Sequence, residues 1–348
     1  MSLTVVQVAY PFAPVGPDAV GGAEVVLTAL DAALTRMGHR SVVVACAGSS
    51  VAGELVPTPL PDGVIDDAAR AAVHRAHRRG IRAVTSGADL VHMHGIDFHA
   101  YLPPPGLPVL ATLHLPPDWY PPGTLHPARP DTWLNPVSAT QARACPPSPA
   151  ILPPVGNGVP VERLDLRLTR RGYALALGRV CPEKNFGAAL EAGTRAGVPV
   201  LIGGQVFPYA EHERYWREEV RPRLVNGHRF LGPLPFARKR RLLAGARCLL
   251  SASLAPETSS LVAMEALACG TPVIAFPSGA LAEIVEDGVT GFLVRDAAEM
   301  AAALREVGRI DPAACRAAAR RRFSEERMVG AYLDLYARLA AAARHAAE

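Results

Sequence analysis

Hydrophobic residues in this chain form short apolar runs that alternate with longer segments of helical periodicity. Residues 3–9 are a β-branched run, residues 21–38 carry apolar side chains at helical spacing, and residues 41–47 form a second run. Such alternation is typical of βαβ units built on a parallel sheet. The same pattern predicts a helix over 66–79 and strands over 89–92 and 108–114.

Residues 103–160 break the alternation because proline recurs throughout them. Proline lacks a backbone N–H and has a fixed φ, so it is rare within helices and central strands. We therefore expect this stretch to form ordered surface loops and a linker between domains that ends near residues 156–158.

The alternation starts again after Arg171. It predicts strands over 173–177, 198–203, 228–231, 248–251 and 272–276, and helices over 185–196, 211–224, 238–246 and 259–269. From residue 297 onward the sequence is rich in alanine and arginine and is predicted to be helical. The chain is thus predicted to be an α/β protein of two Rossmann-like, doubly wound domains with a cleft between them.

Composition and charge exclude several classes of protein. The chain has 348 residues, of which 49% are hydrophobic and 20% charged, and this excludes a disordered chain. A net charge of +4 is too small for a dedicated nucleic-acid binder. Neither a signal peptide nor an uncharged apolar stretch of membrane-spanning length is recognised, so a cytoplasmic location is expected. The six cysteines form no CxxC pair and are interpreted as buried, reduced thiols rather than as disulfides or a zinc site.

The loops that leave the predicted strands are the places to search for a site, because ligands of open parallel sheets bind beyond the carboxyl ends of the strands. Gly21 and Gly22 open the first helix, where backbone amides can approach an anion such as a phosphate. A plain turn is the alternative, and neither GxGxxG nor GxxxxGK[ST] marks a nucleotide fingerprint here.

A second loop follows the first strand of the second half. It contains Gly178, Arg179 and Lys184. Lys184 and Lys239 are the only lysines of the chain, which favours Lys184 as a point charge that meets a phosphate. The alternative is a solvated loop in which Lys184 forms an ion pair with Glu183.

The segment 256–272 is the most informative stretch of the sequence. Glu257 precedes a predicted helix that Ser259 or Ser260 can cap, with free backbone amides in its first turn. Glu265 lies within the otherwise apolar part of this helix, where a carboxylate is costly unless it accepts hydrogen bonds, for example from a vicinal diol. The alternative is that Glu265 reaches solvent on an exposed helix face.

These motifs together resemble those of the retaining GT-B glycosyltransferases of family GT4, also called glycosyltransferase group 1. The resemblance rests on residues 21–24 (GGAE), on Arg179 with Lys184, on the pair Glu257 and Glu265 within a segment that ends EALACGTPVIA, and on residues 286–294 (EDGVTGFLV). It covers nearly the whole chain and is strongest over 173–295. It implies an acceptor-side domain over 1–160, a nucleotide-sugar domain over 161–325, and a final helix over 326–348 that crosses back to the first domain.

The resemblance also implies roles for individual residues. Glu265 would bind the ribose hydroxyls and Glu257 the hydroxyls of the donor sugar. Arg179 and Lys184 would neutralise the diphosphate. The remaining implied contacts are Gly21, Gly22, Gly178, Ser259, Ser260 and Leu261 near the nucleotide and phosphates, and His114 beside the donor sugar.

The implied reaction moves a sugar from a nucleoside-diphosphate sugar to an acceptor hydroxyl with retention of configuration. The leaving phosphate deprotonates the acceptor, and Arg179 and Lys184 stabilise the departing charge, so neither a cofactor nor a metal is expected. The family commonly has Pro-Phe-Gly after the position of Glu257, whereas this chain has Thr258-Ser259-Ser260, so the donor sugar is not carried over. Two alternatives remain: a nucleotide-sugar hydrolase or epimerase on the same fold, and a non-catalytic nucleotide-sugar-binding scaffold.

Three further features have simpler interpretations. His92 and His94, with His99 nearby, share a strand face but lack the carboxylate or cysteine that completes most metal sites, so we expect them to line the acceptor site. The basic runs 75–79 and 238–241 are interpreted as solvated helix faces rather than as lipid contacts. Three aromatic residues of the proline-rich stretch either stack on a sugar or pack against the loops: Trp119, Tyr120 and Trp133.

Overall fold

The computed structural model describes residues 2–61, 63 and 65–347 of the chain. Two compact units can be distinguished. Unit 1 comprises Met1–Asn157 together with Met328–Glu348, and unit 2 comprises Gly158–Arg327.

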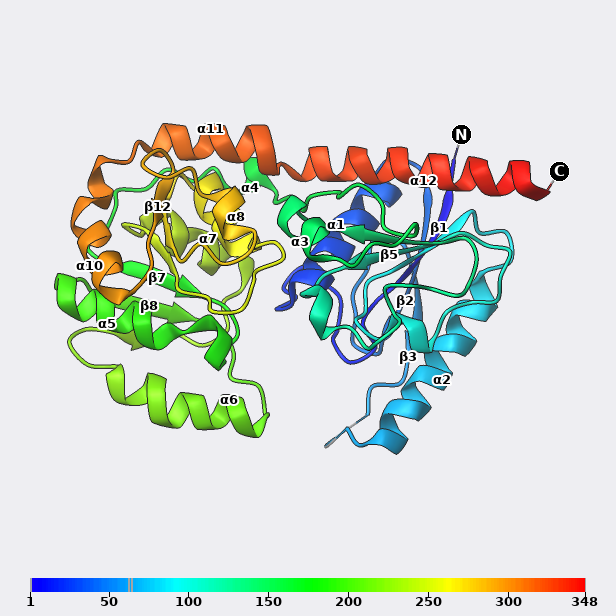
Figure 1. Ribbon diagram of the computed structural model, residues 1–348, viewed down its shortest axis with the longest axis horizontal. Coiled ribbons are helices and arrows are strands. Elements are labelled where there is room, and N and C mark those ends of the chain that lie inside the picture. The colour runs from blue at the N-terminus through cyan, green and yellow to red at the C-terminus, as the bar shows by residue number, and fades with distance from the viewer. Residues whose placement is uncertain (1, 62, 64, 348) are drawn as a thin grey trace. The chain divides into compact units, whose positions relative to one another are not determined.

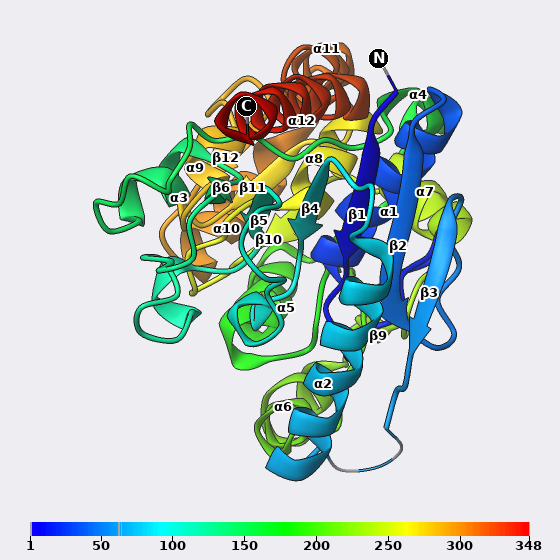
Figure 2. The same cartoon turned by 90° about the vertical axis from the view of Figure 1, so that its right-hand side faces the viewer.

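Unit 1 contains a six-stranded, all-parallel sheet with the strand order β3-β2-β1-β4-β5-β6 (Figures 1 and 2). The order reverses direction at β1, which is the doubly wound arrangement predicted from the sequence. Its elements are β1 (Thr4–Val8), α1 (Gly22–Arg36), β2 (Arg40–Cys46), β3 (Glu54–Thr58), α2 (Asp67–Val84), β4 (Leu90–Met93), η1 (Phe98–Ala100), β5 (Val109–Leu113), η2 (Pro117–Trp119), β6 (Thr132–Pro136), α3 (Ala139–Ala144) and most of α12 (Glu325–Ala347).

Unit 2 repeats this topology with the order β12-β11-β10-β7-β8-β9, again all parallel (Figure 1). Counted from its own first strand, the order is the same as in unit 1. Its elements are α4 (Val161–Leu164), β7 (Ala174–Leu177), η3 (Pro182–Lys184), α5 (Phe186–Ala196), β8 (Val200–Gly203), α6 (Ala210–Tyr215), η4 (Trp216–Val220), η5 (Arg221–Arg223), β9 (Arg229–Phe230), α7 (Phe236–Gly245), β10 (Leu249–Ser251), α8 (Leu261–Ala268), β11 (Val273–Ala275), α9 (Leu281–Ile284), β12 (Gly291–Leu293), α10 (Ala297–Glu306), η6 (Val307–Arg309) and α11 (Pro312–Phe323).

The expectation of loops throughout residues 103–160 is wrong for β6 and α3, and strand β3 was not predicted at all. Strand β12 was missed as well, and all three missed strands lie at an edge of their sheet. Two of them contain proline, Pro57 in β3 and Pro136 in β6. An edge strand tolerates proline because its outward N–H has no partner to lose. Trp133 lies on β6, paired with Leu110 of β5, and is therefore a sheet residue rather than a loop residue.

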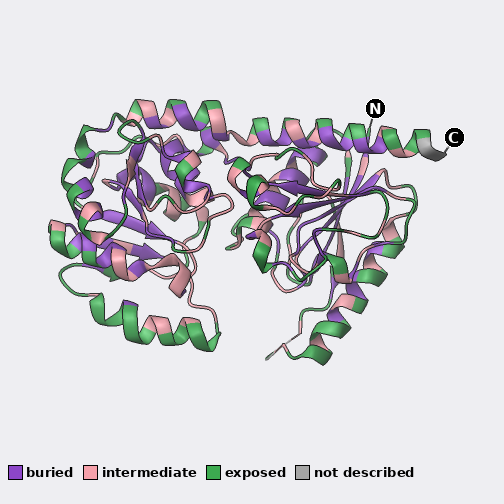
Figure 3. Cartoon of the chain, viewed as in Figure 1, coloured by how far each residue is buried: buried purple, intermediate pink, exposed green. Residues whose placement is uncertain are grey.

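The core of unit 2 lies on both faces of its sheet, as the purple strands in Figure 3 show. Successive residues of a strand point to opposite faces. Leu175 and Leu249 accordingly pack in one apolar cluster, together with α8 and α11, whereas Ala174 and Leu250 pack in the other, with α5 and α10. This two-sided burial explains why the strands are continuous apolar runs in the sequence.

Helix α12 docks on unit 1 through two buried tyrosines. The hydroxyl of Tyr336 lies 2.7 Å from Nδ1 of His92, and that of Tyr332 lies 3.0 Å from the hydroxyl of Thr112 and accepts from Asn135 at 2.9 Å. Strands β4, β5 and β6 thereby share polar contacts with the helix. No helix in the described part of the chain, α12 included, is both long and apolar enough to cross a membrane.

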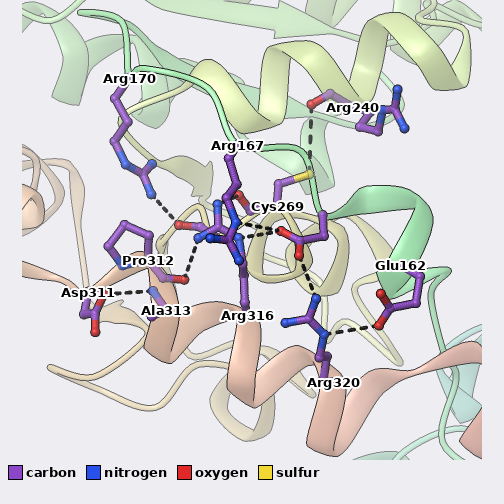
Figure 4. A network of polar contacts seen from close by, with 12 residues as sticks. Glu162, Arg167, Arg170, Arg240, Cys269, Asp311, Pro312, Ala313, Arg316 and Arg320 are labelled. Atoms are coloured by element: carbon purple, nitrogen blue, oxygen red, sulfur yellow. Dashed lines mark hydrogen bonds and ion pairs between the residues drawn. The ribbon is translucent and has the colours of Figure 1, made fainter.

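A polar network fastens α11 to its neighbours within unit 2 (Figure 4). Nε of Arg316 lies 2.9 Å from Asp165, which follows α4, and the same arginine donates to the carbonyl of Cys269 at 3.1 Å. Arg320 contacts the second oxygen of Asp165 at 2.7 Å. Because Cys269 directly follows α8, the network holds the carboxyl end of that helix in place.

Candidate active site

The loops that follow β7, β10 and β11, which carry Lys184 and Glu257, are joined to one another beyond the carboxyl ends of these strands. The carbonyl of Glu183 in η3 accepts the N–H of Leu254 at 2.8 Å, and this contact ties the loop after β7 to the loop after β10. The carbonyl of Glu257 accepts the N–H of Ala280 at 2.7 Å, which ties the loop after β10 to the one after β11. Gly279 makes this approach feasible, since a Cβ there would lie 2.3 Å from the Glu257 carbonyl and its φ is +59°.

Lys184 and Glu257 form an ion pair in this loop cluster. Nζ of Lys184 lies 2.5 Å from Oε1 of Glu257, and the Glu257 side chain is 13% exposed. Burial alone would raise the pKa of Glu257, but the charge and hydrogen bond of Lys184, assisted by Ser253 and Arg179, lower it below its ordinary value. The alternative pairing of Lys184 with Glu183 is therefore wrong.

Gly178, at the end of β7, lies against the side chain of Lys184. Its φ is +150°, and a Cβ there would lie 3.6 Å from the methylene stem of Lys184. The Lys184 chain thus extends across the glycine at the end of β7, and its ammonium reaches the loop after β10.

Glu265 and Lys239 form a second, more deeply buried pair. Nζ of Lys239 lies 2.6 Å from Oε1 of Glu265, whose side chain is only 5% exposed. The alternative in which Glu265 reaches solvent is therefore wrong. Oε2 of Glu265 is buried and has no hydrogen-bond partner among the described residues. A buried carboxylate oxygen without a donor is costly, so this atom is positioned to accept from a ligand.

Lys239 is the functional candidate that the sequence reasoning missed. It was assigned to a solvated basic helix face, but the structure pairs it with Glu265. The two lysines of the chain therefore each neutralise one of the two glutamates, Glu257 and Glu265. The rarity of lysine in the sequence was the signal that could have identified both.

Arg179 lies on the loop between β7 and η3 and is partly buried. Within the part of the chain that the structure describes, its guanidinium forms no hydrogen bond or ion pair that would occupy its donors. Arg179 nevertheless contributes to the electrostatics, since its charge helps to lower the pKa of both Glu257 and Glu183. Its planar donors therefore remain available to an anion.

The start of α8 differs from the expectation. The helix begins at Leu261, and Ser260 occupies the N-cap position without accepting a side-chain capping hydrogen bond. The predicted capping role of Ser259 and Ser260 is therefore wrong. The hydroxyl of Ser259 is buried without a hydrogen-bond partner among the described residues, so it joins Oε2 of Glu265 as an unpaired polar group on this segment.

In unit 1, Gly21 and Gly22 lie at the start of α1 as predicted, with Gly21 as an extended N-cap. The carboxylate of Glu24 packs against Gly21 so closely that a Cβ on Gly21 would lie 1.9 Å from Oε2 of Glu24. A larger residue at position 21 would have to displace this carboxylate, which is the far end of a flexible side chain. Glu24 also places a negative charge at the positive end of the helix dipole.

His114 follows β5 in unit 1 and stacks on His94, with Nδ1 of His94 3.1 Å from Nε2 of His114. Burial lowers the pKa of His114 to about 3, so both rings are neutral near pH 7. Nε2 of His94 is buried without a hydrogen-bond partner among the described residues. His92 does not line a site as expected, because it is fully buried and both of its nitrogens contact hydroxyl groups.

Residues that match known protein families make up most of each unit. Residues 173–309 match the family described as glycosyl transferases group 1, and residues 20–152 match the one described as Glycosyltransferase Family 4. The chain belongs to the family 4 glycosyltransferases. The resemblance seen in the sequence motifs is thereby confirmed.

Individual relatives agree with this assignment. A segment of 53 residues is 57% identical to the D-inositol 3-phosphate glycosyltransferase of Geodermatophilus obscurus, but it covers 15% of this chain and only 12% of that protein. AviGT4, a glycosyltransferase involved in avilamycin A biosynthesis, has a TM-score of 0.74 at 23% identity over 97% of this chain and 98% of its own. Anabaena HepE, solved with UDP and glucose, has a TM-score of 0.75 at 17% identity over 96% and 99%. The two structural likenesses show that the fold is GT-B.

Proposed function

We propose that this protein is a retaining glycosyltransferase that moves a sugar from a nucleoside-diphosphate sugar to an acceptor hydroxyl. The observation that carries the proposal is the pair of buried ion pairs in unit 2. Glu257 and Glu265 are each held by a lysine, and Glu265 keeps one buried oxygen that has no partner among the described residues. Such an arrangement leaves specific acceptor atoms for a polyhydroxylated ligand.

Glu265 is proposed to bind the ribose of the donor. Lys239 engages Oε1 and keeps the carboxylate charged in a buried position, which leaves Oε2 as the free acceptor. A ribose diol supplies hydroxyl donors that satisfy this atom. The resulting hydrogen bond is to a charged group and therefore contributes more than a neutral one.

Arg179 and Lys184 are proposed to bind the diphosphate. A lysine ammonium has three donors, of which Glu257 engages one of those of Lys184 in the described part of the chain, so others remain for phosphate oxygens. When the anomeric C–O bond breaks, negative charge develops on the departing diphosphate, and fixed cations stabilise it most at that point. The acceptor hydroxyl passes its proton to a leaving phosphate oxygen while its own oxygen forms the new bond to the anomeric carbon on the same face.

The other predicted site residues are proposed to contact the donor sugar or the nucleotide. The Glu257 carboxylate, which Lys184 holds through Oε1, is proposed to accept from donor-sugar hydroxyls, and neutral His114 to hydrogen-bond the same sugar. The buried Ser259 hydroxyl, which has no partner within the described part of the chain, is proposed as a donor to the nucleotide or its phosphates, together with the segment of Ser260 and Leu261. The crystal structure of HepE with UDP and glucose supports a nucleotide sugar as the class of donor.

The stereochemical course tests this proposal directly. The protein is incubated with UDP-, GDP-, ADP- and TDP-glucose without acceptor, and the sugar released by slow hydrolysis is followed by NMR before it mutarotates. A retaining enzyme releases first the anomer present in the donor. Release of the inverted anomer would contradict the proposal. An acceptor panel distinguishes a transferase, which consumes donor faster with acceptor, from a hydrolase, which does not, whereas binding without any turnover would favour a scaffold.

A further inference from the structure

A cluster of metal-ligating side chains lies in unit 2 beside the residues assigned to the donor but separate from them. Cys181, Glu183 and His212 each offer one ligand atom, and these atoms lie within 4.8 Å of one another. Cys181 and Glu183 belong to the loop of η3, and His212 belongs to α6, 29 positions after Glu183 in the sequence. The fold therefore assembles a thiol, a carboxylate and an imidazole from two separate elements.

The imidazole of His212 has a ring nitrogen that its surroundings leave unsatisfied in the described part of the chain. Its Nδ1 is buried and has no hydrogen-bond partner among the described residues. The ring is held by aromatic neighbours, with centroids 5.1 Å from Tyr209 and 6.4 Å from Phe207. A buried ring nitrogen without a partner is costly, and a bound cation would satisfy it.

The positions of the other two ligands are also fixed. Cys181 is 1% exposed, and its thiol hydrogen-bonds the Glu183 side chain and makes a longer contact, 3.6 Å, to the carbonyl of Arg179. The backbone of Glu183 is anchored through its carbonyl, which accepts from Leu254 at 2.8 Å and from the Ser253 hydroxyl at 3.2 Å. Two residues of one anchored loop and one residue of a helix thus bring their ligand atoms within 4.8 Å of one another.

We propose that Cys181, Glu183 and His212 bind a divalent transition-metal ion, with Zn²⁺ as the best fit. Thiolate and imidazole select Zn²⁺ over Mg²⁺ and Ca²⁺, which prefer oxygen ligands. A thiolate and a carboxylate together balance the two charges of the ion, and the thiol proton is released to solvent when the metal binds. Three protein ligands leave one tetrahedral position for water.

This ion ties α6 to the loop that carries the diphosphate-binding candidates. Arg179 lies two residues before Cys181, and Lys184 lies one residue after Glu183. The metal therefore stabilises the loop conformation that presents both cations, without itself contacting the diphosphate. Cys-x-Glu with a distant histidine is not a recognised zinc motif, so this site is not apparent from the sequence, and the proposal departs from the expectation that no cysteine is a metal ligand.

Cobalt titration tests the site without any donor or activity. The full chain is freed of metal with a chelator under reducing conditions and titrated with Co²⁺. We expect one Co²⁺ per chain, with the near-ultraviolet absorption of a thiolate–cobalt bond and the visible bands of a four-coordinate ion, both abolished by one equivalent of Zn²⁺. Absence of the near-ultraviolet band in the wild-type protein would overturn the proposal.

Variants assign the ligands. Cys181→Ser is expected to abolish the near-ultraviolet band, and His212→Gln to lower Co²⁺ affinity by at least about 10-fold. Cys145→Ser is the matched control, because Cys145 is a partly buried thiol in unit 1, and it should leave the titration unchanged. Circular dichroism establishes that each variant is folded. A band that persists in Cys181→Ser, or an unchanged affinity in a folded His212→Gln, would contradict the site whether or not the protein proves to be a transferase.

Discussion

Lys184→Ala is expected to lower turnover by about 100- to 1000-fold, which is the range seen when one preorganised donor to a developing charge is removed. The ammonium of Lys184 is held 2.5 Å from Glu257 over Gly178, so it is already oriented before the donor binds. Its contribution is greatest when the diphosphate departs, because only then is the full negative charge developed. Steady-state kinetics with the donor that the protein uses measures the effect.

Two comparisons separate this loss from misfolding. The affinity for the corresponding nucleoside, which has no phosphate, should change little in Lys184→Ala, and Lys184→Arg should recover part of the turnover. Arg195→Ala is the matched control, since it removes a cation from an exposed surface pair with Glu191 in the same unit. Equal losses of turnover and of nucleoside affinity would show that Lys184 is structural rather than catalytic.

Acidification is expected to destabilise unit 1 strongly because of its buried histidines. Burial lowers the pKa of His77 to about 4, although its hydrogen bond to the carbonyl of Ala9 acts in the opposite direction. In the unfolded chain the same histidine takes up a proton near pH 6.5. Unfolding therefore takes up a proton between about pH 6.5 and pH 4, and the free energy of unfolding falls as the pH falls through this window.

The expected size of this effect is about 2 kcal/mol for His77 between pH 7 and pH 5. Burial also lowers the pKa of His92, His94 and His114, so their contributions act in the same direction. Urea denaturation at pH 7 and at pH 5 measures the change in the free energy of unfolding. The measurement uses a Trp216→Phe background, in which the remaining tryptophans lie in unit 1 and report on its unfolding. His77→Gln should reduce the pH dependence, whereas His126→Gln, which replaces an exposed histidine, should not. A pH-independent free energy of unfolding would contradict the assignment of these histidines as buried and neutral.

Much of the fold could be predicted from the sequence, because buried parallel strands appear as uninterrupted apolar runs. Strands β7 and β8 are examples, and both were found within one or two residues. The missed strands β3 and β6 contain proline, which is usual only at a sheet edge, and an edge cannot be recognised before the strand order is known. Strand β12 is also an edge strand, and its three residues, Gly291–Leu293, begin with glycine, which is unfavourable in a strand.

The candidate site was predictable where a residue type was unusual for its surroundings. Glu265 stood out as a carboxylate in an apolar helix, and Lys184 as a rare lysine in a strand-exit loop. The partner of Glu265 was not predictable, because Lys239 lies 26 positions away on α7 and only the packing of α7 against α8 brings the two together. The contact between Glu24 and Gly21 was likewise not predictable, because it depends on the conformation of the Glu24 side chain and not on the spacing of the two residues in the sequence.

The central claim is that unit 2 binds a nucleoside diphosphate through Glu265, and calorimetry with UDP, GDP, ADP and TDP tests it most directly. We expect one of the four to bind the wild-type protein, and Glu265→Ala to weaken that binding by about 10- to 100-fold through loss of a hydrogen bond to a charged group. Glu306→Ala, which removes an exposed glutamate of the same unit, should leave it unchanged. Binding of none of the four, or equal affinity in the wild-type protein and a folded Glu265→Ala, would contradict the account.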